Sequence, residues 1–294
     1  MTRPIVVTGA AGQLGRTLLR GGGGTIPVVG LTRTDLDITR DDEVRAKLEA
    51  LRPSAILNCA SDNDVDAAED HPDRALDVNA FGVRTLAQGA EAIGATLVHY
   101  STDFVFAGTA TRPYLEADAP EPQSVYAASK LLGEWLAGEA PGAYVLRVES
   151  LFGAEGPRHG RRSSLDTIVE RIRAGHEVPV FTDRTVSPSY VHDVANATFA
   201  LLDLRPEPGL YHCVNGGVAS WYEIAEEAAR ILGVSPNLKP LTLADVNLRA
   251  PRPKYCALSN AKLAAAGIRM PAWQEALRRY LEGLLSTDLL TPDS

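Results

Sequence analysis

Short apolar runs alternate along this chain with longer stretches in which apolar residues recur every three or four positions. The runs are rich in valine, isoleucine and leucine, and they lie at residues 5–8, 26–31, 55–60, 96–100 and 143–148. Continuous apolar runs are typical of strands that are buried on both faces of a parallel sheet. Helical periodicity fills the intervals, for example over residues 41–51 and 73–93. The alternation predicts an α/β fold, a Rossmann-type doubly wound parallel sheet with helices on both faces.

A glycine-rich turn joins the first run to the helical stretch that follows it. Gly9, Gly12 and Gly15 are spaced three apart, directly after the run Ile5–Thr8. Glycines at such a turn let the backbone approach a pyrophosphate, whose charge is stabilised by the N-terminus of the next helix. The sequence therefore predicts a dinucleotide-binding element, one residue longer at its start than the usual Gly-x-Gly-x-x-Gly fingerprint.

The residues after the second run bear on which dinucleotide is bound. A NAD-specific protein usually places an acidic residue there, where it holds the ribose 2′-hydroxyl. This chain has Thr32 and Arg33 at that point. Since an arginine suits a 2′-phosphate, we expect NADPH as the cofactor, with NADH possible.

From about Leu151 the pattern is less regular, and this change predicts two parts. We expect an NAD(P)-binding Rossmann domain over residues 1–150, to which later strands near residues 180 and 211 are added. Residues 151–294 are expected to form mainly a smaller substrate-binding region. Because later strands would return to the sheet, the two parts are expected to be interleaved.

A tyrosine and a lysine lie four residues apart in the stretch Val125–Lys130. On a helix this spacing places Tyr126 and Lys130 on one face, about one turn apart. A neighbouring ammonium favours the phenolate and lowers the pKa of a tyrosine, which can then exchange a proton near neutral pH. Ser101 and Thr102 follow the fourth apolar run. They stand where reacting groups of open α/β sheets gather, at the carboxyl end of a strand.

Composition and charge narrow the function classes. The net charge of −8 disfavours indiscriminate nucleic-acid binding. No apolar run is long enough to span a bilayer, and a strand pattern begins close to Met1 with no signal peptide before it. We therefore expect a cytoplasmic protein without a membrane partner. The three cysteines lie far apart and are expected to be reduced thiols. No histidine pair has metal-ligand spacing, so no metal site is predicted.

Two basic stretches suggest an anionic ligand such as a diphosphate. They cover residues 156–162 and 249–255 in an otherwise acidic chain. The acidic stretch Asp62–Asp66 resembles the opening of a calcium loop. Its sixth position is Ala67 instead of glycine, however, and its twelfth is Asp73 instead of glutamate. We interpret it as a polar loop followed by a helix start.

These pieces together resemble an extended short-chain dehydrogenase/reductase, through the glycine turn, the run Ser101–Phe106 and the Tyr126/Lys130 pair. More narrowly, the chain resembles the dTDP-4-dehydrorhamnose reductase family over about residues 4–284. The segments that carry this narrower resemblance are Gly12–Gly15, Leu36–Thr39, Val65–Glu69, Ser129–Glu134, Ser187–Val191, Gly209–His212, Asn215–Gly217 and Arg252–Pro253.

The resemblance implies that NAD(P)H reduces the C4 carbonyl of a 4-keto-6-deoxy sugar carried on a nucleotide diphosphate. In this reading Tyr126 gives the proton, Lys130 keeps the tyrosine acidic and holds the nicotinamide ribose, and Thr102 hydrogen-bonds the carbonyl oxygen. The residues implied at the cofactor, besides Arg33, are Gly9, Gly12, Gln13, Leu14, Asp37, Ile38, Ala60, Ser61, Tyr100, Tyr126 and Lys130. The residues implied at the sugar nucleotide are Thr102, Asp103 and Arg252. Either a monomer or a homodimer is compatible with the resemblance.

One segment departs from the family pattern. After the strand that ends at Val148 the family usually has Thr-Ser-Trp, whereas this chain has Val148, Glu149 and Ser150. Ser150 thus stands where the tryptophan would pack near the sugar, and we count it among the substrate-binding positions. Loss of an aromatic wall with the acid/base pair retained predicts a different sugar. Full turnover of dTDP-4-dehydrorhamnose, at rates typical of enzymes, would contradict that prediction.

Two other functions stay open. The regulatory subunit of methionine adenosyltransferase is similar to this same family, so the fold can serve as a cofactor-binding partner without essential turnover. A nucleotide-sugar epimerase or dehydratase would instead keep its NAD tightly bound and recycle it. Similar dehydratases carry Asp-Glu after the threonine, whereas Phe104 follows Asp103 here.

Overall fold

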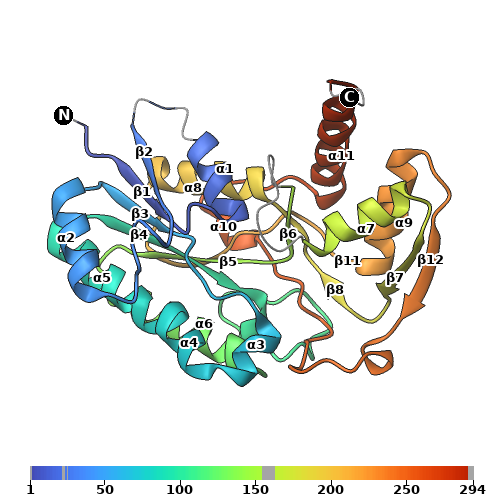
Figure 1. The fold of residues 1–294 in the computed structure, drawn as a ribbon, viewed down its shortest axis with the longest axis horizontal. Helices are drawn as coiled ribbons and strands as arrows, with labels where there is room; N and C mark the ends of the chain where they lie inside the picture. Colours follow the sequence, from blue (N-terminus) through green and yellow to red (C-terminus); the bar gives the residue numbers. More distant parts are fainter. Residues whose placement is uncertain (1, 22–23, 25, 154–162, 291–294) are drawn as a thin grey trace.

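A six-stranded parallel sheet lies at the centre of the larger part of the molecule (Figure 1). The computed structural model of the chain describes residues 2–21, 24, 26–153 and 163–290. In spatial order the strands are β10 (Gly209–His212), β5 (Tyr144–Val148), β4 (Thr96–Thr102), β3 (Ala55–Asn58), β1 (Ile5–Thr8) and β2 (Val28–Leu31). Every neighbouring pair runs parallel. The predicted Rossmann-type α/β sheet is confirmed, and so is the return of a strand near residue 211.

Helices cover both faces of this sheet (Figure 1). One face carries α1 (Gln13–Gly21), α8 (Val191–Leu204) and α10 (Ala261–Ala265), and the other carries α2 (Asp41–Leu51), α5 (Gly82–Ile93) and α6 (Val125–Ala137). Alternate residues of each strand therefore enter different cores: Val7 packs with α1 and α8, whereas Val6 packs with α2 and α5. Burial on both faces is the physical reason why the strands are continuous apolar runs in the sequence.

A smaller unit lies beside this sheet (Figure 1). It contains the strands β7 (Glu177–Phe181) and β12 (Asn237–Leu241) and the helices α7 (Ser164–Arg173), α9 (Trp221–Leu232) and α11 (Trp273–Leu290). The prediction that a strand near residue 180 joins the main sheet is wrong, because β7 forms a separate two-stranded sheet with β12. The chain nevertheless crosses between the parts, since α8 and β10 follow β7 and return to the main sheet. The division into domains at residue 150 stays a prediction.

Several short elements connect these parts. The strand β6 (Leu151–Phe152) pairs with β9 (Ser189–Tyr190), and β8 (Thr185–Val186) pairs with β11 (Ala219–Ser220). The 3₁₀ turns are η2 (Asp103–Val105) and η3 (Leu243–Asp245). The first of them directly follows β4, so it turns the chain at the carboxyl end of the sheet.

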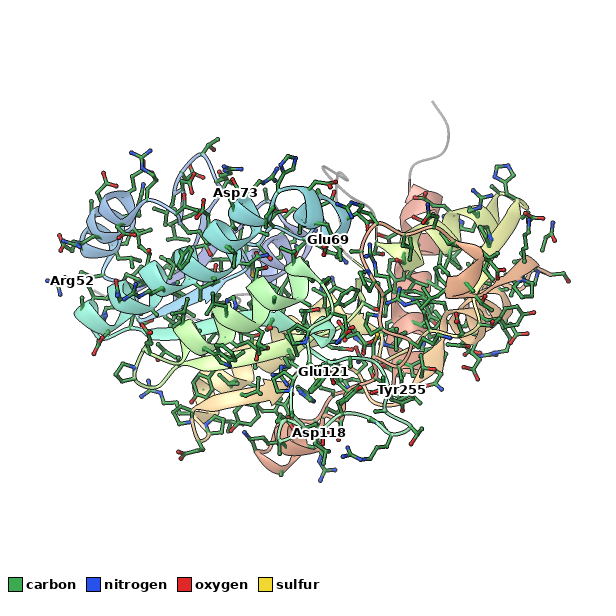
Figure 2. All side chains as sticks on the ribbon, turned by 90° about the horizontal axis from the view of Figure 1, so that it is seen from below. Arg52, Glu69, Asp73, Asp118, Glu121 and Tyr255 are labelled. Atoms are coloured by element: carbon green, nitrogen blue, oxygen red, sulfur yellow. The ribbon has the colours of Figure 1, made fainter. Side chains whose placement is uncertain are left out.

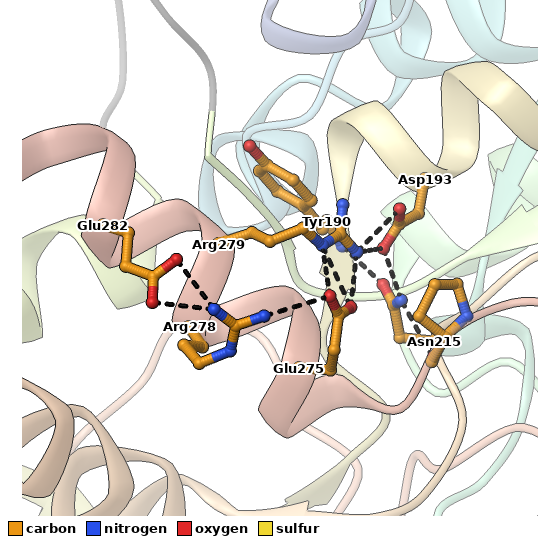
Figure 3. A network of polar contacts seen from close by, with 8 residues as sticks. Tyr190, Asp193, Asn215, Glu275, Arg278, Arg279 and Glu282 are labelled. Atoms are coloured by element: carbon orange, nitrogen blue, oxygen red, sulfur yellow. Dashed lines mark hydrogen bonds and ion pairs between the residues drawn. The ribbon is translucent and has the colours of Figure 1, made fainter. Parts of the chain in front are cut away.

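A partly buried polar network ties α11 to α8 (Figure 3). Arg279 of α11 donates to both carboxylate oxygens of Asp193 on α8, at 2.9 and 2.7 Å, and also to Glu275. Asn215 donates to the same Asp193 at 2.7 Å and accepts a hydrogen bond from the Tyr190 backbone N–H. Because the buried carboxylate is satisfied from two sides, the network stabilises the smaller unit against the sheet.

The helical region after β3 contains an interruption. The helices α3 (Val65–Asp70) and α4 (Pro72–Leu76) and the π-helical turn η1 (Asp77–Phe81) precede α5, where one helix from residue 73 is predicted. In η1 the buried Asn79 side chain accepts from Ser61 Oγ at 2.9 Å and donates to Ser129 Oγ at 3.0 Å. Such π-helical turns frequently occur at functional sites. Here the turn connects the loop after β3 to helix α6.

The close contact of α6 with η1 leads to a stability prediction. A Cβ atom on Gly133 would overlap the Asn79 carbonyl oxygen. We expect Gly133→Ala to lower the free energy of unfolding by about 1–3 kcal/mol, because the helix must move away from η1. Urea unfolding followed by circular dichroism measures this difference. Gly283→Ala on α11 is the control, since no atom beyond the adjoining backbone of its own helix lies within 4 Å of its added Cβ. A Gly133→Ala protein as stable as that control would contradict the prediction.

The described residues also bear on two expectations from composition. Cys59, Cys213 and Cys256 are all free thiols, as expected for reduced cysteines. Within the part of the chain that the structure describes, no helix combines the length and the apolar character needed to cross a membrane.

Candidate active site

A cavity of about 510 Å³ opens at the carboxyl ends of the central strands. Its walls come from the loops after β1, β3, β4 and β5 and from residues of the smaller unit, such as Trp221. The sequence-predicted residues that line it are Gly12, Gln13, Leu14, Ser61, Tyr100, Thr102, Asp103, Tyr126, Lys130, Ser150 and Arg252. Gly9, Arg33, Asp37, Ile38 and Ala60 are not part of this lining. The fold thus brings most of the predicted cofactor residues and all four predicted substrate residues into one place.

The glycine turn forms the wall of the cavity beside β1. Gly9 has a φ of +64°, and a Cβ there would lie 2.5 Å from the backbone of Cys59. A Cβ on Gly15 would lie 2.5 Å from the Gly9 carbonyl oxygen. Both positions therefore require glycine, and the turn delivers the N-terminus of α1 to the cavity. The buried side-chain atoms Gln13 Nε2 and Arg16 Nε have no hydrogen-bond partner among the described residues. Unpaired donors beside a helix N-terminus fit the pyrophosphate of a dinucleotide.

The end of β2 lies outside the lining of the cavity. The Arg33 side chain is 76% exposed, and its Nε lies 3.8 Å from Asp37 Oδ2. Thr39 donates to Asp37 from its backbone N–H and its hydroxyl, and these bonds lower the pKa of the Asp37 carboxyl. This corner is consequently polar and open, and the role of Arg33 in cofactor choice stays a prediction.

Helix α6 carries the tyrosine and the lysine into the cavity. Its N-terminus is capped by Ser124, which accepts from the Ala127 N–H at 3.2 Å. Glu69 of α3, labelled in Figure 2, accepts from the Val125 N–H at 2.8 Å and holds the same end. Tyr126 and Lys130 are both buried, at 7% and 3% exposure.

The electrostatics of this pair differ from the expectation. Burial raises the pKa of the Tyr126 phenol; the Thr102 hydrogen bond opposes this, and Asp103 adds to it. Lys130 Nζ donates to the Tyr100 carbonyl oxygen at 2.6 Å. The net shift of the Tyr126 pKa is upward, opposite to the predicted net lowering, and the part that Lys130 plays in tuning the tyrosine stays a prediction. Burial also lowers the pKa of Lys130 to about 8.

A buried ion pair holds α6 against the sheet. Arg147 of β5 donates through Nε and Nη2 to the two carboxylate oxygens of Glu134, at 2.8 and 2.7 Å. Ser101 of β4 donates to Glu134 Oε1 at 2.6 Å. Glu134 lies one turn beyond Lys130 and raises its pKa. The ion pair therefore positions the helix face that carries Tyr126 and Lys130.

The residues predicted to bind the substrate line the same cavity as Tyr126. Thr102 donates to Asp103 Oδ1 at 3.0 Å and accepts from the Phe104 N–H. Ser150 has a φ of +46°, a left-handed conformation that is costly for a residue other than glycine. Arg252 Nη2 lies 2.9 Å from Asp66 Oδ2, which fixes the guanidinium at the cavity edge.

The structure adds residues that the sequence analysis missed. Arg184, between β7 and β8, and Trp221, at the start of α9, both line the cavity. Trp221 is buried and provides an aromatic wall in a site where Ser150 does not. No periodic or motif signal marks either residue, since both reach the cavity only through the packing of the smaller unit.

The second basic stretch contributes less to the cavity than expected. Arg249 pairs with Asp70 and Lys254 with Asp183, so most of the second stretch is neutralised on the surface. Only Arg252 of that stretch lines the cavity. The first stretch, residues 156–162, lies outside the described residues.

Comparison with known proteins gives a consistent result. The family model described as the RmlD substrate binding domain matches residues 2–286. The chain is 35% identical to the spore coat polysaccharide biosynthesis protein SpsK of Bacillus subtilis, over 95% of this chain and 96% of that protein. It is 36% identical to a dTDP-4-dehydrorhamnose reductase of Mycolicibacterium smegmatis, over 95% of this chain and 85% of that protein. A crystal structure of a dTDP-4-dehydrorhamnose reductase from Bacillus anthracis in complex with NADP superposes with a TM-score of 0.89 at 31% identity, covering 96% of this chain and 100% of that one.

Proposed function

The chain belongs to the RmlD substrate binding domain family, and on this premise we propose that it is an NADPH-dependent reductase of nucleotide-linked sugars. Its reaction is the reduction of the C4 keto group of a 4-keto-6-deoxy sugar. The observation that carries the proposal is that the N-terminus of α1, Thr102 and Tyr126 with Lys130 line the same cavity. A dinucleotide and a proton donor can meet there over one carbonyl carbon.

In this proposal NADPH supplies the hydride, and the residues of this chain handle the oxygen and its proton. The Thr102 hydroxyl lies beside the Tyr126 hydroxyl and donates to Asp103; when the substrate binds, its proton turns to the carbonyl oxygen, where negative charge develops. Tyr126 donates its proton to that oxygen. Because the pKa of Tyr126 is raised, the phenol is protonated at neutral pH, and an alkoxide is a strong enough base to take the proton.

Lys130 supplies a positive charge beside the reacting group. Its pKa of about 8 leaves the ammonium mostly protonated at neutral pH. The bond to the Tyr100 carbonyl oxygen holds the ammonium in the cavity wall, and its remaining N–H groups can donate to a ribose. The positive charge of the ammonium stabilises negative charge on either reacting oxygen, that of the substrate carbonyl or that of the Tyr126 hydroxyl.

The residues on the other side of the cavity suit a sugar nucleotide. Arg252 and Arg184 offer cationic donors to a diphosphate, and the Trp221 ring offers an apolar face to a sugar or a base. Phe104 packs edge-on against the Tyr126 ring, with centroids 5.8 Å apart. That contact places an apolar ring where a dehydratase would need a carboxylate, which favours the reductase over the elimination chemistry.

The test is consumption of NADPH with a panel of dTDP-linked 4-keto-6-deoxy hexoses, among them dTDP-4-dehydrorhamnose generated in situ. Turnover with at least one member supports the reductase. Because Ser150 replaces an aromatic wall, we expect a member other than dTDP-4-dehydrorhamnose to be the best substrate. Tight NADPH binding without turnover of any member would refute the reductase and favour the regulatory-subunit alternative. A pull-down for a stable protein partner would then follow.

Arg33 is expected to set the cofactor preference. Arg33→Ala should raise the KM for NADPH about tenfold and leave the KM for NADH nearly unchanged, because a charged hydrogen bond to the 2′-phosphate is lost. Initial rates measured over a range of NADPH and NADH concentrations give the two KM values and their ratio. Arg20→Ala, in the last turn of α1, is the control. Equal changes for NADPH and NADH would contradict the role of Arg33.

A further inference from the structure

Glu149 is a buried carboxyl that the proposed reaction does not use. It follows β5 directly and is 1% exposed. Its Oε2 accepts from the Ser187 N–H at 2.7 Å, whereas its Oε1 is buried and has no hydrogen-bond partner among the described residues. A buried carboxylate oxygen without a donor is costly, so this oxygen needs an explanation.

A second buried carboxyl lies next to it. Oxygens of Glu149 and Asp103 and the sulfur of Cys256 all lie within 4.8 Å of one another, and all three residues are buried. Asp103 accepts from Thr102 at 3.0 Å and lines the cavity. Two carboxyl groups this close, away from water, cannot both ionise without a large electrostatic cost.

The cluster already contains one cation. Arg184 lines the cavity, places Nη2 3.9 Å from Cys256 Sγ, and lowers the pKa values of both Asp103 and Glu149. One guanidinium balances one carboxylate. The second carboxyl is balanced most simply by a proton, which would also turn the unpaired Oε1 of Glu149 into a donor.

We propose that Glu149 holds a proton at neutral pH and shares it with Asp103, acting as a positioning residue that keeps the Asp103 carboxylate beside Thr102. Burial and the neighbouring Asp103 charge raise the pKa of Glu149, and only the Ser187 bond and Arg184 oppose them. The titratable groups that face Glu149 are Asp103 from η2, Arg184 before β8, and Tyr255 and Cys256 from the segment after residue 250. Burial also raises the pKa values of Tyr255 and Cys256, so neither adds charge at neutral pH.

The consequence for catalysis rests on the proposed function. The Asp103 carboxylate raises the pKa of Tyr126 and so weakens it as an acid. Ionisation of Glu149 would add a second negative charge next to Asp103 and oppose the developing alkoxide. The shared proton therefore limits the negative charge beside the reacting oxygen over the neutral range.

Infrared spectroscopy tests the shared proton without any substrate. The spectrum of the wild type at neutral pH should contain the carbonyl band of a protonated carboxylic acid that Glu149→Gln removes. Asp103→Asn should shift the loss of this band to lower pH, because Glu149 then lacks its like-charged neighbour. Glu91→Gln, at an exposed position, should leave the band unchanged. A spectrum that is the same in wild type and Glu149→Gln would overturn the proposal, whether or not the protein reduces a sugar.

The pH dependence of stability is a second readout. A carboxyl whose pKa is raised in the folded state binds a proton that the unfolded chain has released, so stability falls as pH rises from the ordinary carboxyl pKa toward the folded value. Glutamine at position 149 cannot titrate. The melting temperature of Glu149→Gln relative to wild type should therefore rise between pH 4.5 and neutral pH. A constant difference over this range would contradict the proposal.

In the reductase assay, the same substitution should extend kcat/KM to higher pH. The wild type is expected to lose activity when Glu149 ionises, and Glu149→Gln should lack this step of the pH profile. A purely structural role would change the rate by the same factor at every pH. An equal factor at every pH, together with the same infrared spectrum in wild type and Glu149→Gln, would leave Glu149 as a packing residue only.

Discussion

Replacing Tyr126 with phenylalanine is expected to lower kcat for keto-sugar reduction by about 10³-fold and to leave NADPH binding nearly unchanged. The substitution removes only the hydroxyl. The ring keeps its edge-on contact with Phe104 and its place on α6, so the cavity keeps its shape. In the proposed reaction the oxygen of the substrate then loses its proton donor, and Thr102 can supply a hydrogen bond but no proton.

Two measurements separate loss of chemistry from loss of structure. Fluorescence titration with NADPH reports cofactor binding, and single-turnover rates report the hydride step. Tyr144→Phe is the matched control, because the Tyr144 hydroxyl donates to the Pro206 carbonyl far from the cavity. A Tyr126→Phe enzyme within about tenfold of wild type would show that another group supplies the proton.

Glu134→Gln is expected to lower the free energy of unfolding by about 3–5 kcal/mol, as for other buried ion pairs that lose one partner. The guanidinium of Arg147 would stay buried at 3% side-chain exposure without a counter-charge. Ser101 would also lose the carboxylate that accepts its hydroxyl. Urea unfolding of the purified variant measures the change.

The same substitution should alter the pH dependence of activity. Glu134 raises the pKa of Lys130, so its loss lowers that pKa below about 8. If the ammonium must be protonated, activity is present below this pKa and is lost as pH rises through it. The alkaline limb of the pH profile should consequently move to lower pH. Glu139→Gln is the control, since its pair with Arg84 is at 3.7 Å and half exposed on both sides. We expect Glu139→Gln to change the free energy of unfolding by less than about 1 kcal/mol. Equal effects of Glu134→Gln and Glu139→Gln would contradict the role given to the buried ion pair.

The apolar core of the sheet allows a pocket with unfavourable electrostatics to persist. The sheet core on both faces is apolar and continuous, and it supplies the stability. The carboxyl end of the sheet instead holds Glu134, Asp103 and Glu149 almost without solvent contact. Clusters of perturbed ionisable groups are characteristic of functional sites, where stability is given up for chemistry.

The sequence by itself determined the sheet and the local motifs of the candidate site. The apolar runs predicted the strands because burial on both faces leaves no room for polar residues. The glycine turn and the Tyr126/Lys130 spacing are local features, whose geometry depends on backbone conformation within one or two turns. Such features can be recognised without knowledge of the rest of the fold.

The tertiary structure alone decided which distant residues meet. Only packing of the smaller unit brings Arg184 and Trp221 to the cavity, and only the pairing of β7 with β12 excludes that strand from the main sheet. The acceptor of Lys130 and the neighbour of Glu149 likewise depend on contacts between segments far apart in the chain. Charge and pKa are set by burial and by neighbours within a few ångströms. The sequence names the titratable groups of this site, but the protonation of each follows from the packing around it.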